Sequence, residues 1–188
     1  RDVLAASGFL SESGVGGEVI VVDDGSSDQT AEEAENAPVA PDVDCRVLRY
    51  ERHRGKGYAI RTGMTASQHD YAMFADSGLC IPFLYALRGM DILETGEADL
   101  AHGSRRLPAS EIVHAHSRHR RLLSTIFRRI VPRILGIPEH LTDTQCGFKV
   151  YPGERARELY GLCRTDGFLF DIEIILLIKS CFENLGVD

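Results

Sequence analysis

The sequence lacks the features of a disulfide-rich, zinc-binding or membrane-spanning protein. It has five cysteines, an odd number, and none of them forms a C-x-x-C pair. We therefore expect neither a disulfide framework nor a zinc site. The cysteines are expected to be reduced thiols in a cytosolic compartment. No apolar run approaches the ~18 residues that a membrane span needs, and no signal-peptide pattern is found at the start.

What remains is the composition of one acidic globular domain. The chain has 188 residues, of which 44% are hydrophobic and 26% are charged, which is enough apolar material for one core and argues against disorder. The formal net charge is −7. A negative chain disfavours nucleic acid as a partner, because that binding depends on neutralising phosphates.

Apolar stretches alternate with helix signals along the first two thirds of the chain. The predicted strands are 18–24, 45–50, 71–76 and 100–105, and the predicted helices are 30–36, 55–64 and 82–94. Such an alternation predicts an α/β fold with a mostly parallel sheet flanked by helices. Ligands in these sheets bind beyond the carboxyl ends of the strands, where Asp23, Asp24 and Asp76 fall.

The two ends of the sequence read as interrupted elements. Residue 1 lies within a helical pattern, and residue 188 follows directly on a helix-stop signal. We expect residues 1–188 to form a single domain that is truncated at both ends.

A basic segment stands out from the acidic remainder. Residues 102–133 hold eight arginines and one glutamate, a net charge of +7, so the rest of the chain carries −14. Paired apolar residues recur every four positions, which predicts an amphipathic basic helix over 119–135, with Pro132 kinking or interrupting it. It is either an ordinary surface helix or an interfacial helix that lies on anionic lipid.

Five motifs in order carry a resemblance to a known family. V-V-D-D-G-S-S-D-Q-T at 21–30, R-G-K-G at 54–57 and the strand-end Asp76 resemble the family-2 glycosyltransferases of GT-A fold. G-S-R at 103–105, R-R-L-L-S at 120–124 and D-T-Q-C-G-F-K at 143–149 resemble the dolichyl- and polyprenyl-phosphate sugar synthases within that family. The family's first strand, with its P-x-Y-N-E segment, is not found in this sequence.

The resemblance implies a site for a nucleotide-diphosphate sugar. Asp23 and Asp24 would contact the base or ribose, although an Asp-Gly-Ser turn could use both acids structurally. Lys56 would face phosphate at a helix N-terminus, or its flanking glycines serve only the turn. Asp76 would bind Mg²⁺ or Mn²⁺ together with the diphosphate. Gly78 replaces the second acid of the family's metal motif, so either one carboxylate suffices or metal binding is lost.

The resemblance also implies an acceptor site. Arg105, Arg120 and Arg121 would hold the phosphate of a polyprenyl lipid, because guanidinium pairs with two phosphate oxygens at once. Asp143 would lie near the anomeric carbon, as a base for a sugar hydroxyl or as an orienting group for a phosphate acceptor. Among the later residues, Gln145 and Lys149 are expected to support this loop. Two further acids, at 171 and 173, are expected to face different sides of an apolar helix.

The implied reaction is an inverting sugar transfer to a polyprenyl or dolichyl phosphate at the cytoplasmic face of a membrane, with the protein held there peripherally. UDP-glucose is the favoured donor, and GDP-mannose is next. Two alternatives stay open: a family-2 enzyme with a saccharide or other soluble acceptor, and a non-catalytic nucleotide-sugar-binding domain.

Overall fold

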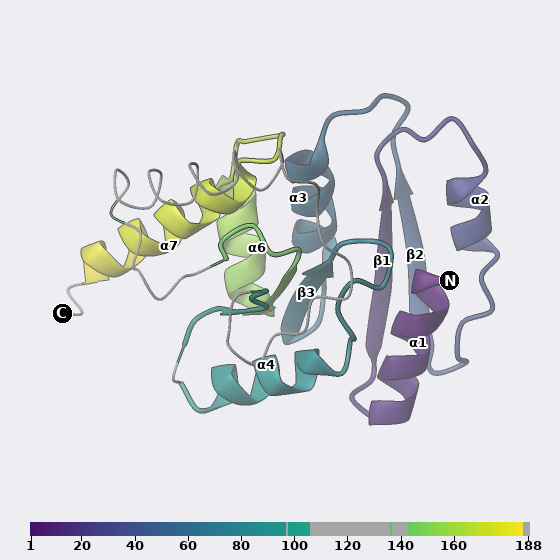
Figure 1. The fold of residues 1–188 in the computed structure, drawn as a ribbon, viewed down its shortest axis with the longest axis horizontal. Helices are drawn as coiled ribbons and strands as arrows, with labels where there is room; N and C mark the ends of the chain where they lie inside the picture. The colour runs from purple at the N-terminus through teal and green to yellow at the C-terminus, as the bar shows by residue number, and fades with distance from the viewer. Residues whose placement is uncertain (97, 106–135, 137–142, 186–188) are drawn as a thin grey trace.

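The computed structural model describes residues 1–96, 98–105, 136 and 143–185. Within these ranges the fold is α/β, with a two-stranded sheet, a three-stranded sheet and helices packed on both. Figure 1 shows α1 and α2 beside the strands β1 and β2, whereas α4, α6 and α7 gather around β3. The helix α3 lies between the two groups.

The first sheet pairs two parallel strands, as the sequence predicts. β1 (Gly17–Asp23) and β2 (Val43–Arg49) pair in register from Gly17 opposite Val43 to Asp23 opposite Arg49. The connection between them contains α2 (Thr30–Glu35), and α1 (Asp2–Ser13) packs on both strands. The apolar run of β1 is therefore enclosed by helices, which explains why it is continuous rather than alternating.

The second sheet contains a strand that the sequence analysis does not predict. β3 (Tyr71–Ala75) and β4 (Ala101–His102) lie on either side of β5 (Phe148–Pro152), which runs antiparallel to both. β5 begins at the end of the D-T-Q-C-G-F-K motif, for which the sequence predicts a loop, and its second residue, Lys149, interrupts the apolar pattern of a buried strand. β4 is also shorter than the predicted 100–105. The predicted α/β fold with a parallel sheet and flanking helices is confirmed, with this antiparallel strand added.

The remaining helices enclose the second sheet. α3 (Lys56–Ala66) packs against β1, β3 and α6, and α4 (Tyr85–Glu94) packs against β4 and β5. α4 begins three residues later than predicted, because Pro82 opens a turn in which its carbonyl accepts a bond from the N–H of Tyr85. α6 (Gly153–Leu162) follows β5 directly, and α7 (Phe170–Leu185) packs on α6.

The core of this half is aromatic. Phe74 of β3 meets Tyr160 and Phe170 edge to face, with ring centroids 6.4 and 5.8 Å apart. The buried hydroxyls of Tyr151 and Tyr160 satisfy each other at 3.0 Å. Because the core joins β3, β5, α6 and α7, the segments that follow β3 and precede β5 are held on a rigid base.

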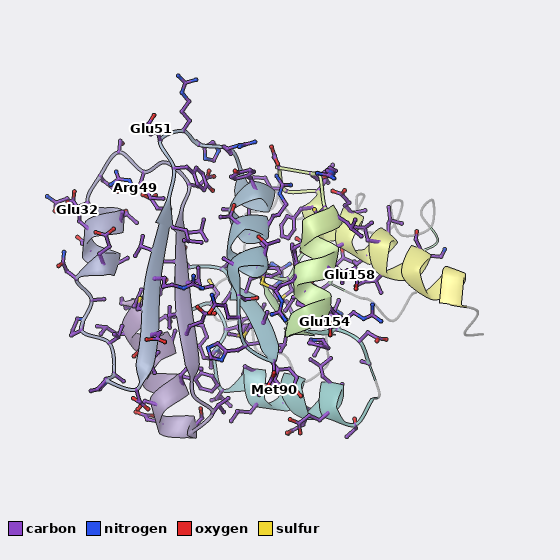
Figure 2. All side chains as sticks on the ribbon, turned by 180° about the vertical axis from the view of Figure 1, so that it is seen from behind. Glu32, Arg49, Glu51, Met90, Glu154 and Glu158 are labelled. Carbon is purple, nitrogen blue, oxygen red and sulfur yellow. The ribbon has the colours of Figure 1, made fainter. Side chains whose placement is uncertain are left out.

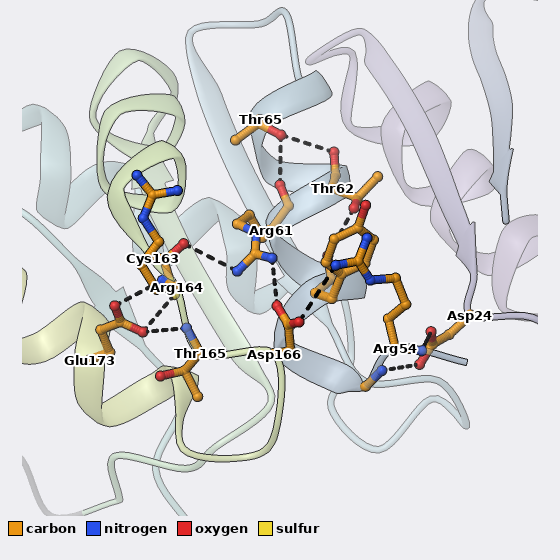
Figure 3. Close-up of polar contacts among 12 residues, drawn as sticks. Asp24, Arg54, Arg61, Thr62, Thr65, Cys163, Arg164, Thr165, Asp166 and Glu173 are labelled. Atoms are coloured by element: carbon orange, nitrogen blue, oxygen red, sulfur yellow. Dashed lines mark hydrogen bonds and ion pairs between the residues drawn. The ribbon is translucent and has the colours of Figure 1, made fainter. Parts of the chain in front are cut away.

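The loop between α6 and α7 is fixed by one carboxylate. Glu173 accepts hydrogen bonds from the N–H groups of Arg164 (2.8 Å) and Thr165 (2.7 Å) and from the thiol of Cys163 (3.2 Å) (Figure 3). Burial opposes its ionisation, but the hydrogen bonds from Thr165, Arg164 and Cys163 outweigh burial and lower the pKa of Glu173 to about 2.

Glu173→Gln is expected to destabilise the protein at neutral pH by about 1.5–3 kcal/mol, the range for hydrogen bonds to a charged group. The folded-state pKa lies below the ordinary value of 4.5, so this stabilisation is complete above pH 4.5 and is lost as the pH falls toward about 2. Urea unfolding at several pH values measures it. Glu158→Gln, which removes an exposed pair with Arg155, should change stability little at any pH, and a pH-independent effect at Glu173 would contradict the account.

Several expectations concern residues outside the described ranges. The basic helix at 119–135, with Arg120 and Arg121, lies there and stays a prediction. The cysteines whose side chains the structure describes, Cys45, Cys80, Cys146 and Cys163, are free thiols. Among the described residues, no helix is both long enough and apolar enough to cross a membrane.

Candidate active site

The carboxyl end of β1 meets the N-terminus of α3 through Asp24. Its carboxylate accepts a hydrogen bond from the backbone N–H of Arg54 at 2.7 Å (Figure 3). It also accepts one from the N–H of Gly55 at 3.0 Å, and Nδ1 of His53 lies 2.7 Å from it. Burial raises the pKa of Asp24, but these bonds outweigh burial and lower it overall. Asp24 is therefore an ionised group that fixes the turn leading into α3.

Asp23 is the buried neighbour of Asp24 at the end of β1, 3% exposed. Its Oδ1 accepts a bond from the N–H of Ser26 (2.9 Å), and its Oδ2 lies 3.3 Å from Nε of Arg49 without forming a hydrogen bond. Ser26 and Arg49 also line an open pocket of about 400 Å³ together with Tyr50 and Glu51. Figure 2 shows Arg49 and Glu51 at the end of β2. This pocket is a hollow open to solvent, at the end of the strands where Asp23 lies.

An aromatic pair that the sequence analysis did not identify lies between this pocket and α3. The rings of Tyr50 and Tyr58 meet edge to face at 5.2 Å, and the guanidinium of Arg54 stacks over Tyr58 at 3.6 Å. Burial and the neighbouring Asp24 carboxylate raise the pKa of the Tyr50 phenol. No sequence motif marks this pair, because it depends on how the end of β2 meets α3.

The first residue of α3 contacts the residue that follows β3. Nζ of Lys56 lies 2.7 Å from Oδ1 of Asp76, which follows β3. Gly55 has φ +111°, and a Cβ on Gly57 would overlap the carbonyl oxygen of Thr165 in the α6–α7 loop. The two glycines are thus explained by backbone geometry and packing, while Lys56 itself points at the predicted metal ligand.

Asp76 is held from the other side by the start of β5. Its N–H donates to the carbonyl of Gly147 (2.8 Å), and a Cβ on Gly147 would overlap the Asp76 carboxylate. The glycine of the D-T-Q-C-G-F-K motif is therefore needed for the backbone to approach Asp76 closely.

Gly147→Ala is expected to displace the Asp76 side chain and to cost about 1–3 kcal/mol of stability as overpacking does. In an assay of the sugar transfer that the resemblance implies, it is expected to lower the rate by at least tenfold. Thermal unfolding and initial rates measure the two effects. The control is Gly161→Ala in α6, where no atom lies within 4 Å of the added Cβ. It should stabilise slightly, since Gly in a helix costs about 0.5–1 kcal/mol relative to Ala, and should leave the rate unchanged. Equal behaviour of the two variants would contradict the close approach.

Arg105 and Asp143 form a bidentate ion pair. Nε and Nη2 of Arg105 donate to Oδ2 and Oδ1 of Asp143 at 2.6 and 2.7 Å, and the backbone N–H of Arg105 adds a bond of 3.2 Å. The Asp143 side chain is 2% exposed, whereas that of Arg105 is 46% exposed. Hydrogen bonding to Asp143 raises the pKa of Arg105 against the opposing effect of burial. The fork of Arg105 is thus aimed by a buried carboxylate and keeps one side toward solvent.

The ion pairs Lys56–Asp76 and Arg105–Asp143 lie close enough to influence the same ionisable groups. The pKa of the Cys146 thiol is raised by burial and then by the carboxylates of Asp143 and Asp76, and the Asp76 carboxylate also contributes to the raised pKa of Arg105. The turn over 143–146 and the bond from Asp76 to Gly147 also bring the Lys56–Asp76 pair close to the Arg105–Asp143 pair. Asp23 and Asp24 lie at the neighbouring strand end, on the other side of the start of α3.

The predicted metal ligand stands as a single carboxylate. The position of the family's second acid, Gly78, presents its backbone N–H, which donates to Oδ2 of Asp2 (2.6 Å). Among the described residues, no group of three or more His, Cys, Asp or Glu side chains could hold a metal ion. Asp76 is 42% exposed, so its oxygens fit a hard cation that takes its other ligands from a substrate.

Comparison with known proteins identifies the family of this chain. Residues 16–152 match the model of the family described as "Glycosyl transferase family 2", and the chain belongs to this family. It is 32% identical over 168 residues to the dolichyl-phosphate beta-glucosyltransferase of Dictyostelium discoideum, covering 87% of this chain and 51% of the relative. It is 33% identical over 172 residues to the human dolichyl-phosphate beta-glucosyltransferase, covering 86% and 51%. The chain spans about half the length of the curated relatives it matches.

A solved structure shares the fold. Glucosyl-3-phosphoglycerate synthase from Mycobacterium tuberculosis, crystallised with Mn²⁺, UDP-glucose and phosphoglyceric acid, superposes with a TM-score of 0.61 at 22% identity. The match covers 99% of this chain and 63% of that one. The protein therefore has the GT-A fold.

Proposed function

We propose that the protein is an inverting glycosyltransferase that moves glucose from UDP-glucose to a dolichyl or other polyprenyl phosphate. The observation that carries this proposal is the meeting of two ion pairs, Lys56–Asp76 and Arg105–Asp143, at the carboxyl edge of the strands. One pair supplies groups for a donor diphosphate, and the other supplies a fork for an acceptor phosphate. The similarity to dolichyl-phosphate beta-glucosyltransferases, which extends over most of the chain, supports the same assignment.

The donor would bind across the start of α3. The nucleoside would occupy the pocket beside Asp23, with Asp24 holding the turn that shapes it. The diphosphate would lie beside Lys56 at the start of α3, where the ammonium and the positive end of the helix dipole favour anions. Lys56 would then exchange its contact with Asp76 for one with phosphate.

Asp76 would hold the divalent cation. Bound Mg²⁺ or Mn²⁺ would neutralise negative charge on the departing nucleoside diphosphate. Because this chain offers one carboxylate where its family has two acids, the diphosphate oxygens would complete the coordination. Lys56, once it has exchanged Asp76 for a diphosphate oxygen, would add a second positive charge beside the departing group.

The acceptor phosphate would bind to Arg105, with Arg120 and Arg121 as further proposed contacts. An oxygen of the lipid phosphate would attack C1 of the sugar while the bond from C1 to the diphosphate oxygen breaks, which inverts the configuration at C1. Both oxygens of Asp143 are engaged by Arg105, which suits an orienting role better than that of a general base. A phosphate monoester, with a second pKa near ~6, is already anionic at neutral pH and needs no base, so this geometry favours it over a sugar hydroxyl.

A lipid acceptor places the reaction at a membrane surface. We propose peripheral attachment at the cytoplasmic face, where a basic segment such as residues 102–133 would meet anionic headgroups. The acidic remainder of the chain would face away from the lipid.

The test is a transfer assay with Mn²⁺ or Mg²⁺ present. Labelled UDP-glucose and GDP-mannose are each offered to a short-chain polyprenyl phosphate and, in parallel, to simple glycosides. The expected result is labelled lipid from UDP-glucose. Product on the glycosides alone would favour the soluble-acceptor alternative. Binding of UDP-glucose that is indifferent to metal, with no turnover on any acceptor, would favour a non-catalytic binding domain.

A further inference from the structure

A buried ion pair lies directly beneath the residues of the candidate active site. Nζ of Lys149, on β5, is 2.5 Å from Oδ1 of Asp171, in the first turn of α7, and the two side chains are 2% and 4% exposed. Burial raises the pKa of Asp171, and the Lys149 ammonium opposes this shift. Removing two charges from water is costly, and a buried ion pair commonly stabilises a fold no better than an apolar pair of similar volume. Stability alone therefore does not account for these two residues.

The second hydrogen bond of Lys149 connects the pair to the active site. Its Nζ also donates to the carbonyl of Cys146 at 2.8 Å. The N–H of Cys146 donates to the carbonyl of Asp143 at 3.0 Å, which closes the turn over 143–146. The next residue, Gly147, accepts the N–H of Asp76 at 2.8 Å. The Lys149 ammonium thus supports a short segment that begins at Asp143, the partner of Arg105, and ends at Gly147, which contacts Asp76.

The surroundings fix the direction in which the Lys149 side chain points. The carbonyl of Phe148 accepts the N–H of Gly103 at 2.9 Å, and a Cβ on Gly103 would lie 3.1 Å from Sγ of Cys146. The ring of Phe74 lies under the ammonium, 5.1 Å from Nζ of Lys149 to its centroid. Lys149 is therefore confined in direction, toward Asp171 on one side and the turn on the other.

We propose that the Lys149–Asp171 pair is a positioning device that holds the 143–147 segment, and with it the Arg105–Asp143 fork, at a fixed separation from Asp76. Neither residue is proposed to touch substrate. The consequence for catalysis rests on the proposed function, because acceptor phosphate and donor diphosphate must be aligned for in-line attack. A misplacement of about 1 Å in such a geometry costs on the order of 10²-fold in rate.

The test is the double variant Lys149→Met with Asp171→Val, which replaces the charges by apolar groups of similar volume. The thermal midpoint is expected to be unchanged or raised. Amide hydrogen exchange over 143–148 is expected to quicken by at least tenfold, while β1 and β2 exchange as before. kcat should fall at least tenfold, and KM for UDP-glucose should stay within threefold, because Asp23 and Asp24 do not contact this segment.

Tyr160→Phe is the matched control. It removes the buried hydrogen bond to Tyr151 in the same core, so it should lower the thermal midpoint without altering exchange at 143–148 or kcat. If the double variant does not fold, Lys149→Met alone replaces it, since it removes the donor to the Cys146 carbonyl while the buried Asp171 can take up a proton. Faster exchange at 143–148 in a folded Lys149→Met protein supports the proposal.

The proposal would be overturned if either folded variant showed unchanged exchange at 143–148 and a kcat within twofold of wild type. The pair would then only connect α7 to the sheet. Exchange is measured without substrate. If the wild-type protein transferred no sugar, the proposed function would fail, while the exchange experiment would still decide whether Lys149 and Asp171 hold the turn.

Discussion

Asp76→Asn is expected to lower the rate of sugar transfer by about 10²–10³-fold, or about 2.7–4 kcal/mol, which is typical for loss of one group that stabilises developing charge. Asn keeps the size of the side chain and its packing beside Gly147, but it removes the anionic oxygen that would bind the cation. Stability should change by less than about 1 kcal/mol, because the side chain is 42% exposed and its partner Lys56 can be hydrated.

The measurement is initial rate against Mn²⁺ concentration for wild type and variant. The wild type should show saturable dependence on metal, and the variant should need more metal for any residual rate. Asp91→Asn, a change at another acidic residue on α4 away from the site, serves as the control and should match the wild type. Full activity in Asp76→Asn would refute the assignment of Asp76 as the metal ligand.

Arg105→Lys is expected to lower kcat/KM for the acceptor phosphate by about 10–100-fold, corresponding to roughly 1.5–3 kcal/mol for a lost hydrogen bond to a charged group. Lysine keeps the charge, but it cannot bond both oxygens of Asp143 and still present a planar fork to phosphate. KM for UDP-glucose should stay close to the wild-type value, because the donor is assigned to the other ion pair.

Arg155→Lys provides the control, since Arg155 forms an exposed ion pair with Glu158 on α6 and should tolerate the change. A variant at Arg105 that affects the donor and acceptor constants equally would contradict the division of the site into two halves. So would a rate that falls only when a sugar hydroxyl is the acceptor.

The parts of the fold that could be predicted from sequence are those with an uninterrupted local signal. β1 is predicted by its continuous apolar run, and the start of α3 is predicted by glycines on both sides of Lys56. β5 could not be predicted in this way, because a buried lysine interrupts its apolar pattern and its support is Asp171, 22 residues away. Because β5 lies between β3 and β4, these two strands are not neighbours in the sheet.

In the candidate site, too, single residues can be predicted from motifs, whereas the contacts between them cannot. Motifs identify Asp76, Arg105 and Asp143 as individual residues, and the structure brings them together. Their pairing is not readable from sequence, because the bond between Arg105 and Asp143 spans 38 residues and no local rule aligns them. The stacking of Tyr50, Tyr58 and Arg54 has no motif at all, since it arises only when the segment that follows β2 folds against the start of α3.

The most direct test of the proposed reaction is the anomeric configuration of its product. The protein is incubated with UDP-glucose, whose sugar is α-linked, and a short-chain polyprenyl phosphate, and the purified lipid product is examined by proton NMR. Attack by the acceptor phosphate held at Arg105 predicts a β-linked glucosyl phosphate, with the large anomeric coupling of that configuration. An α-linked product, or glucose found only on a hydroxyl group, would contradict the single in-line displacement.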